Sequence, residues 1–144
     1  MGGAGWNDWY SMGWLFDQGM PVPKEPGVYA IRHAPSGKPR TIPRVFGEDR
    51  EGILCYGMTG GKLRDRLRAF YRAARGNAAA HAEGIRFHHL AYAQNGFPLK
   101  NLQVRWHECE SKEDARNTES QLLNEYATRY GETPPLNRQV PARY

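Results

Sequence analysis

The chain has 144 residues, a length that suits one domain with a single hydrophobic core. Lysine and arginine total 20 against 15 for aspartate and glutamate, which gives a net charge of +5, and most of the basic residues are arginines. With 40% hydrophobic and 24% charged residues the composition excludes a disordered chain, and two cysteines are too few for a disulfide framework.

Residues 1–25 are predicted to form an N-terminal extension that is rich in aromatic side chains. Trp6, Trp9, Tyr10 and Trp14 approximate helical spacing, which favours a short helix packed on the body of the protein. Prolines then indicate an extended linker. They are Pro21, Pro23 and Pro26.

Three strands are predicted from alternating side chains. The first is 27–33, which places Tyr29 on one of its faces, and the second is 53–58. Between them, residues 34–52 are rich in proline, glycine and charge and form an insertion, with a short strand expected at 44–46. The third strand is 102–109.

Two long helices are predicted. The first, 62–75, carries an apolar stripe, and Thr59 or a glycine amide before it is expected to cap it. A second helical start is predicted within 77–90. The last helix, 112–130, follows the N-cap Ser111 and ends at Gly131. The order predicts one α/β sandwich, residues 1–144, with about three strands.

Glu119 is a polar residue where the helical period predicts an apolar one. It lies about 40° from Ala115 on a helical wheel, inside the stripe that contains Leu122 and Tyr126. Burying an unpaired carboxylate costs several kcal/mol, so Glu119 must face a cation, a cavity or a metal. A structural ion pair is the alternative interpretation.

The 62–75 helix combines an inward arginine with outward basic residues. Arg66 lies on the shoulder of the apolar stripe, where a planar guanidinium can bind phosphate or a buried carboxylate. The outer face is either solvated or a contact surface for nucleic-acid phosphates. Its candidate contacts are Lys62, Arg64, Arg68 and Arg72.

An arginine, a carboxylate and a tyrosine that converge on one sheet face suit hydrolysis of a phosphodiester. Glu119 would hold a divalent metal, and the metal and Arg66 would stabilise the charge at phosphorus. Tyr29 would orient or deprotonate the attacking water.

Five short motifs in this order resemble the GIY-YIG nuclease family over residues 26–137. They are Gly27-Val28-Tyr29, Cys55-Tyr56-Gly57-Met58-Thr59, Leu63-x-x-Arg66-Leu67, Glu119-x-x-Leu122-Leu123 and Pro135-Leu136-Asn137. The resemblance implies a mainly antiparallel central sheet flanked by helices, and an endonuclease that cuts DNA with Mg²⁺ or Mn²⁺. By motif position, Tyr29 assists the nucleophile, Arg66 binds the scissile phosphate and Glu119 is the metal ligand. The supporting residues are Gly57, Thr59 and Asn137.

The second motif departs from the family, because its tyrosine position falls at Cys55 and Tyr56 comes one place later. A shift of one residue turns a strand side chain to the other face. Either a bulge restores Tyr56 to the site, which we expect, or Cys55 lines the pocket instead.

Three functions therefore compete. They are a DNA endonuclease, a catalytically weakened nucleic-acid-binding module on the same scaffold, and an interaction domain in which Arg66 and Glu119 form only a structural pair. Choice of a DNA site must come from the insertion, the N-terminal segment, a homodimer or an accessory subunit. The first twenty residues lack the features of a signal peptide, and no apolar run approaches the roughly 20 residues of a membrane span, so a cytoplasmic protein is expected.

Overall fold

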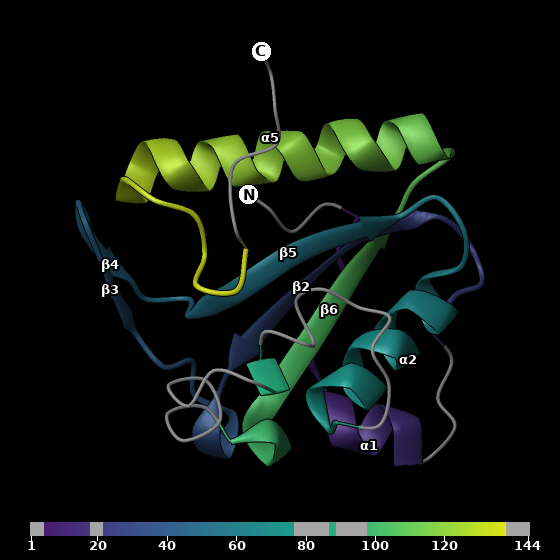
Figure 1. Ribbon diagram of the computed structural model, residues 1–144, viewed down its shortest axis with the longest axis horizontal. Helices are drawn as coiled ribbons and strands as arrows, with labels where there is room; N and C mark the ends of the chain where they lie inside the picture. Colours follow the sequence, from purple (N-terminus) through teal and green to yellow (C-terminus); the bar gives the residue numbers. More distant parts are fainter. Residues whose placement is uncertain (1–4, 18–21, 77–86, 89–97, 138–144) are drawn as a thin grey trace.

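The computed structural model describes residues 5–17, 22–76, 87–88 and 98–137, and its main sheet has four strands in the order β1-β6-β2-β5 (Figure 1). All neighbouring strands are antiparallel. The three long strands are β2 (Gly27–His33), β5 (Ile53–Thr59) and β6 (Leu102–Glu108), and β1 (Tyr10–Ser11) adds two residues beside β6. The mixed α/β class and the antiparallel sheet are thus confirmed, and β1 is an addition to the three predicted strands.

Helices cover both faces of this sheet. The helix α5 (Lys112–Tyr130) lies along one face, whereas α2 (Leu63–Ala74) and α1 (Met12–Asp17) lie on the other (Figure 1). Single 3-10 turns, η1 (Pro35–Gly37) and η2 (Leu99–Asn101), flank the strands. Among the described residues, every helix is too short or too polar to span a lipid bilayer.

The alternation of side chains along β2 divides the core between the two faces. Tyr29 and Ile31 pack with Leu63, Leu67 and other residues of the α2 side. Ala30 packs in a separate cluster on the α5 side, which contains Leu123 and Tyr126. Each helix therefore approaches its own set of β2 side chains.

The ends of α5 are those that the sequence predicts. The side-chain oxygen of Ser111 accepts a hydrogen bond of 3.1 Å from the amide of Asp114, which caps the first turn. Gly131 ends the helix with a φ of 82°, a left-handed conformation that glycine adopts without steric cost.

The start of α2 differs from the prediction. Thr59 does not cap the helix, because its hydroxyl accepts from the amide of Gly61 at 3.0 Å and so stabilises the preceding turn. Instead, the first two helical amides donate to the carbonyls of Pro23 and Glu25, each at 2.9 Å. The linker therefore satisfies the exposed amides of α2.

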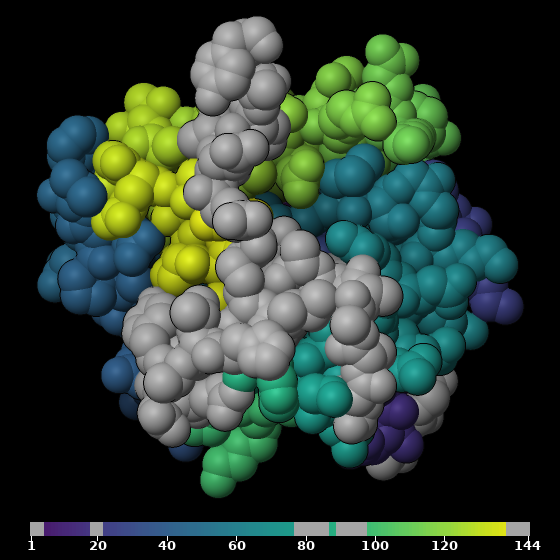
Figure 2. Space-filling view, viewed as in Figure 1, coloured from purple at the N-terminus to yellow at the C-terminus, as the bar shows by residue number. Residues whose placement is uncertain are grey.

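The insertion folds into a two-stranded hairpin of β3 (Ile42–Arg44) and β4 (Gly47–Asp49). The expected strand at 44–46 is wrong in its position, because residues 45 and 46 form the turn. The hairpin lies against the C-terminal end of α5 (Figures 1 and 2), where the amide of Phe46 donates to the carbonyl of Tyr130 at 3.0 Å.

Arg44 holds the hairpin in this place. Its guanidinium donates to the carbonyl of Thr133 at 2.8 Å and lies 3.5 Å from the carboxylate of Glu132. This arginine of the insertion is therefore engaged inside the fold.

Within the described residues of the N-terminal extension, 5–17 and 22–25, the helix is limited to Met12–Asp17. Trp6 and Trp9 precede α1 and lie outside regular secondary structure, which corrects the prediction that they share a helix with Trp14. The reason is a long-range contact of Asn7. Its amide donates to the carbonyl of Trp106 at 3.3 Å, and its side-chain oxygen accepts from the Trp106 amide at 2.7 Å. The start of a helix predicted within 77–90 lies mostly outside the described residues.

His33 is expected to make the stability of the fold depend on pH. It is buried at the end of β2, where burial and then the positive charge of Arg40 lower its pKa. The pKa of a histidine in the unfolded chain is about 6.5. Below this pH the unfolded chain binds a proton at His33, whereas the folded chain, with its lower pKa, does not. We expect stability to fall with decreasing pH there, by up to about 1.4 kcal/mol per pH unit. In urea unfolding between about pH 7.5 and 5.5, His33→Phe should flatten the dependence. If the parent and His33→Phe lost equal stability over this pH range, His33 would not be the group responsible.

Candidate functional site

The side chain of Tyr29 passes across β5 at Gly57. Tyr29 lies in the middle of β2, directly opposite Gly57, and is fully buried. A Cβ atom placed on Gly57 would overlap the Cζ and the hydroxyl oxygen of Tyr29. Because β5 is the edge strand of the sheet, the phenol reaches the sheet edge over a residue without a side chain.

This contact predicts a coupling between the two positions. Gly57→Ala is expected to cost about 1–3 kcal/mol of stability, because the new methyl group competes with the phenol for the same space. In a Tyr29→Leu background the same change should cost clearly less. Urea unfolding of the two single variants and the double variant measures the coupling. An unchanged cost of Gly57→Ala in both backgrounds would contradict it.

Arg66 is half-buried on α2, as its place on the shoulder of the apolar stripe predicts. Its neighbours on the stripe, Leu63 and Leu67, are fully buried. The Nε atom of Arg66 is shielded from water and has no hydrogen-bond partner in the described part of the chain. A buried donor without an acceptor costs about 1–3 kcal/mol, which an oxyanion bound at this position would recover.

The outer basic residues of α2 divide into two groups. Lys62, Arg68 and Arg72 are exposed, as predicted. Arg64 is half-buried, and its Nε donates to the carbonyl of Val22 at 3.2 Å. The prediction that Arg64 faces outward is therefore wrong, because the linker folds back over the start of the helix.

Glu119 is half-buried on α5. On a helical wheel it lies between Ala115 and Leu123, which are both buried against the sheet. Since α2 and α5 lie on opposite faces, Arg66 and Glu119 come from opposite sides of the sheet, and the expectation that Tyr29, Arg66 and Glu119 converge on one sheet face is wrong for Glu119. Both helices contact β5, so the edge of this strand is the place where side chains from the two helices can meet.

Asn137 is fixed at the same edge. Its side-chain oxygen accepts from the amide of Tyr56 and its side-chain nitrogen donates to the carbonyl of Tyr56, both at 3.0 Å. The amide of Leu136 donates to the carbonyl of Leu54 at 2.8 Å. The segment that contains Asn137 thus braces the β5 backbone immediately before Gly57.

Tyr56 lies on the opposite face of the sheet from Tyr29. It pairs with Ala30 and packs with Tyr126, whose ring centroid is 6.4 Å away. The register of β5 does shift, but the extra residue is Leu54, so the irregularity comes before Cys55. The expectation that a bulge restores Tyr56 to the face of Tyr29 is therefore wrong.

Cys55 takes the position that the family pattern gives to its second tyrosine. It pairs with Ile31 and is buried in the same cluster as Tyr29. A thiol therefore lies on the α2 side of β5, where a phenol was expected. Burial raises the pKa of the Tyr56 phenol on the other side, so that group stays neutral.

Asp49 is a buried carboxylate beside a cavity, and the sequence interpretation missed it. It is buried, and its carboxylate accepts from the amides of Glu51, Gly52 and Ile53 at 2.9, 3.1 and 3.0 Å. The hydroxyl of Tyr126 donates to it at 2.8 Å. The spacing of Asp49 and Gly52 is a turn signal that points to the local bonds but not to Tyr126.

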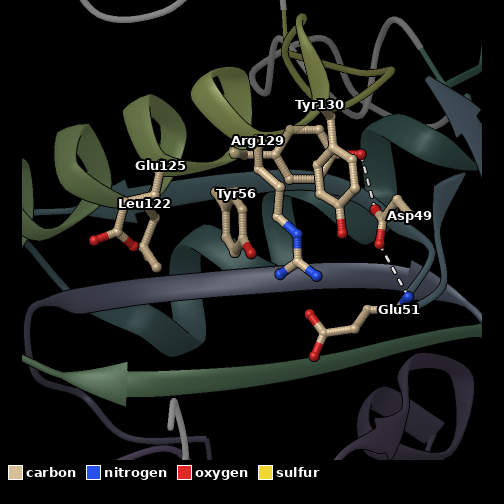
Figure 3. Close-up of a pocket in the computed structure, with 8 residues that line it drawn as sticks. Asp49, Glu51, Tyr56, Leu122, Glu125, Arg129 and Tyr130 are labelled. Carbon is tan, nitrogen blue, oxygen red and sulfur yellow. Dashed lines mark hydrogen bonds between the residues drawn. The ribbon is translucent and has the colours of Figure 1, made fainter. Parts of the chain in front are cut away.

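A cavity of about 140 Å³ lies beside this carboxylate, between α5 and the sheet (Figure 3). Arg129 and Glu51 point toward one another across it. Burial, and then the hydrogen bond to Asp49, raise the pKa of Tyr126. The lining residues are Asp49, Glu51, Tyr56, Leu122, Glu125, Tyr126, Arg129 and Tyr130.

A metal would have to be held by few protein ligands. Within the described ranges, no group of three or more histidine, cysteine, aspartate and glutamate residues is arranged to bind a metal. Mg²⁺ commonly uses one or two carboxylates and completes its shell with water and substrate phosphate. The single half-buried carboxylate of Glu119 fits that donor set.

Comparisons of the chain with protein-family models, with curated proteins and with solved structures returned no match. The functional argument therefore depends on the residues of this chain.

Proposed function

We propose that this protein is a metal-dependent endonuclease that hydrolyses phosphodiester bonds in DNA. The observation that carries the proposal is the shielded Nε of Arg66, a cationic donor without an acceptor in the described part of the chain. A phosphate oxygen is the acceptor that a guanidinium fits best. Tyr29 supports the proposal, because its phenol reaches the edge of β5 from the same face.

The proposed roles follow from these positions. Arg66 donates to the scissile phosphate and stabilises its growing negative charge. Tyr29 orients the attacking water, and Glu119 supplies the carboxylate ligand of Mg²⁺ or Mn²⁺. When bound, such a metal acts as a Lewis acid on the phosphate. Asn137 keeps the β5 backbone in place beside these groups.

DNA is the proposed substrate because of the exposed basic face of α2. Lys62, Arg68 and Arg72 can each contact a backbone phosphate without reading sequence. A homodimer or an accessory subunit remains the proposed source of site choice. Both cysteines are buried thiols that form no disulfide, which suits the reducing conditions of the cytoplasm.

The test is nicking of supercoiled plasmid with Mg²⁺, with Mn²⁺ and with EDTA. We expect relaxed circles with either metal and none with EDTA. The assay should also include branched and single-stranded DNA. Absence of cleavage on all three substrates would refute the nuclease.

One observation favours a second candidate, a DNA-binding module without cleavage. Cys55 stands on the α2 side of β5 where the family pattern has a second tyrosine, so β5 adds no tyrosine to the face of Tyr29. This candidate predicts binding of DNA in EDTA with no nicking when metal is added.

A further inference from the structure

Two arginines share the α5-side face of the sheet, away from Arg66. They are Arg32 on β2 and Arg105 on β6, and both are half-buried. Arg105 pairs with Ala30 across the strands, and Arg32 pairs with Gln103, so both point to the face of Ala30. Arg66, the proposed catalytic arginine, lies on the opposite face of the sheet from this pair.

Two tryptophans of the N-terminal segment hold these arginines. The guanidinium carbon of Arg105 lies 4.6 Å from the ring centroid of Trp6 and 4.7 Å from that of Trp9. The guanidinium carbon of Arg32 lies 4.1 Å from the Trp9 centroid, and its Nε donates to Gln103 at 2.9 Å. Stacking on an aromatic face fixes a guanidinium plane and leaves its edge to bind an acceptor.

The charges of this pair are incompletely compensated. The Nε of Arg105 is shielded from water and has no hydrogen-bond partner among the described residues. Burial lowers the pKa of Arg32, and repulsion by Arg105 lowers it further, by more than the opposing attraction of Glu51. Holding two cations together costs free energy that an oxyanion bound to both would recover.

Attachment of the N-terminal segment to the sheet explains only part of this arrangement. One arginine between two tryptophans would already fasten the N-terminal segment, which Asn7 also anchors. Neither the second guanidinium nor the shielded donor of Arg105 serves that purpose. We infer that Arg32 and Arg105 form a second phosphate-binding site, which takes a backbone phosphate of nucleic acid. This inference rests on the proposed function, since it names a further contact to the same substrate.

Binding of labelled DNA in EDTA, followed by fluorescence anisotropy, tests the site without cleavage. We expect the double variant Arg32→Gln, Arg105→Gln to bind about tenfold more weakly and to lower the slope of log affinity against log salt by about one to two. The matched control is Lys100→Gln, Arg116→Gln, which removes the same charge from two exposed positions. Equal losses in the two variants would overturn the inference.

A second pair of variants covers the case in which the glutamine variant does not fold. Arg32→Lys, Arg105→Lys keeps the charge and loses the planar fork, so we expect DNA binding about threefold or more weaker than that of the parent. Inorganic phosphate should produce a saturable change in the tryptophan fluorescence of the parent and a smaller one in the lysine variant. No saturable change in the parent would also overturn the inference.

Plasmid nicking by the same proteins separates the two proposals. Cleavage that persists with unchanged DNA affinity in the glutamine or lysine variant would refute the second phosphate site and leave the nuclease intact. DNA affinity that depends on Arg32 and Arg105, without cleavage by any protein, would refute the nuclease and leave the site intact.

Discussion

Glu119→Gln is expected to lower metal-dependent DNA cleavage by about a thousandfold, or roughly 4 kcal/mol of transition-state stabilisation. The glutamine keeps the size of the side chain and removes the negative charge that would bind the metal. Because Glu119 is only half-buried, the thermal midpoint should change little. Plasmid nicking at saturating Mg²⁺, together with thermal unfolding, measures both quantities.

The matched control is Glu125→Gln, which neutralises an exposed carboxylate six residues later on the same helix. It should cleave at close to the parental rate. Cleavage that survives Glu119→Ala would refute the assignment of the metal ligand. A loss of cleavage that is equal in both variants would show that the total charge of α5, and not one carboxylate, governs the activity.

Asp49→Ala is expected to have the largest effect on stability, a loss of about 3–5 kcal/mol. It leaves three backbone amides and the Tyr126 hydroxyl without their buried acceptor. A domain of ordinary stability, about 5–15 kcal/mol, would lose a large part of it. Urea unfolding of the parent and the variant measures the difference.

Two further variants divide this loss. Tyr126→Phe removes one of the four donors and should cost about 1 kcal/mol. Glu48→Ala changes the exposed neighbour of Asp49 and should stay within about 0.5 kcal/mol of the parent. If Asp49→Ala were as mild as Glu48→Ala, the carboxylate would not organise the start of β5.

The elements that the sequence predicts best are those whose signals are local. β2 has the predicted bounds, Gly27–His33, because its alternation and the proline before it act within the segment. The same holds for α5, Lys112–Tyr130, where Ser111 and Gly131 mark the ends. The half-buried positions of Arg66 and Glu119 follow from helical periodicity alone.

The features that the sequence does not reveal depend on residues far apart in the chain. The bond from Tyr126 to Asp49 joins positions 77 apart, and the bonds from Asn137 to Tyr56 join positions 81 apart. No pattern within one segment contains such a pair. The absence of helix at Trp6 and Trp9 has the same origin, because Asn7 contacts a residue 99 positions later.

The predicted orientation of the Tyr56 side chain is wrong for a different reason. The register from Cys55 to Thr59 is regular, so plain alternation places Cys55 on the face of Tyr29 and Tyr56 on the other face, and the bulge that we expected at this point does not occur. The irregularity of β5 is at Leu54, before both residues, and leaves their faces unchanged. The prediction that Arg64 faces outward is wrong because the linker contacts its side chain. The position of the linker depends on the tertiary fold and not on the pattern of the helix.

An asparagine bonds to the outward-facing backbone groups of one strand on each side of the sheet. Asn137 occupies the amide and the carbonyl of one residue of β5, and Asn7 does the same for one residue of β6. Each of them bonds to both backbone groups of one strand residue, as a neighbouring strand would. Free strand edges recruit strands from other molecules and so begin aggregation. By occupying these backbone groups, Asn7 and Asn137 remove two positions at which a strand of another copy of the chain could pair.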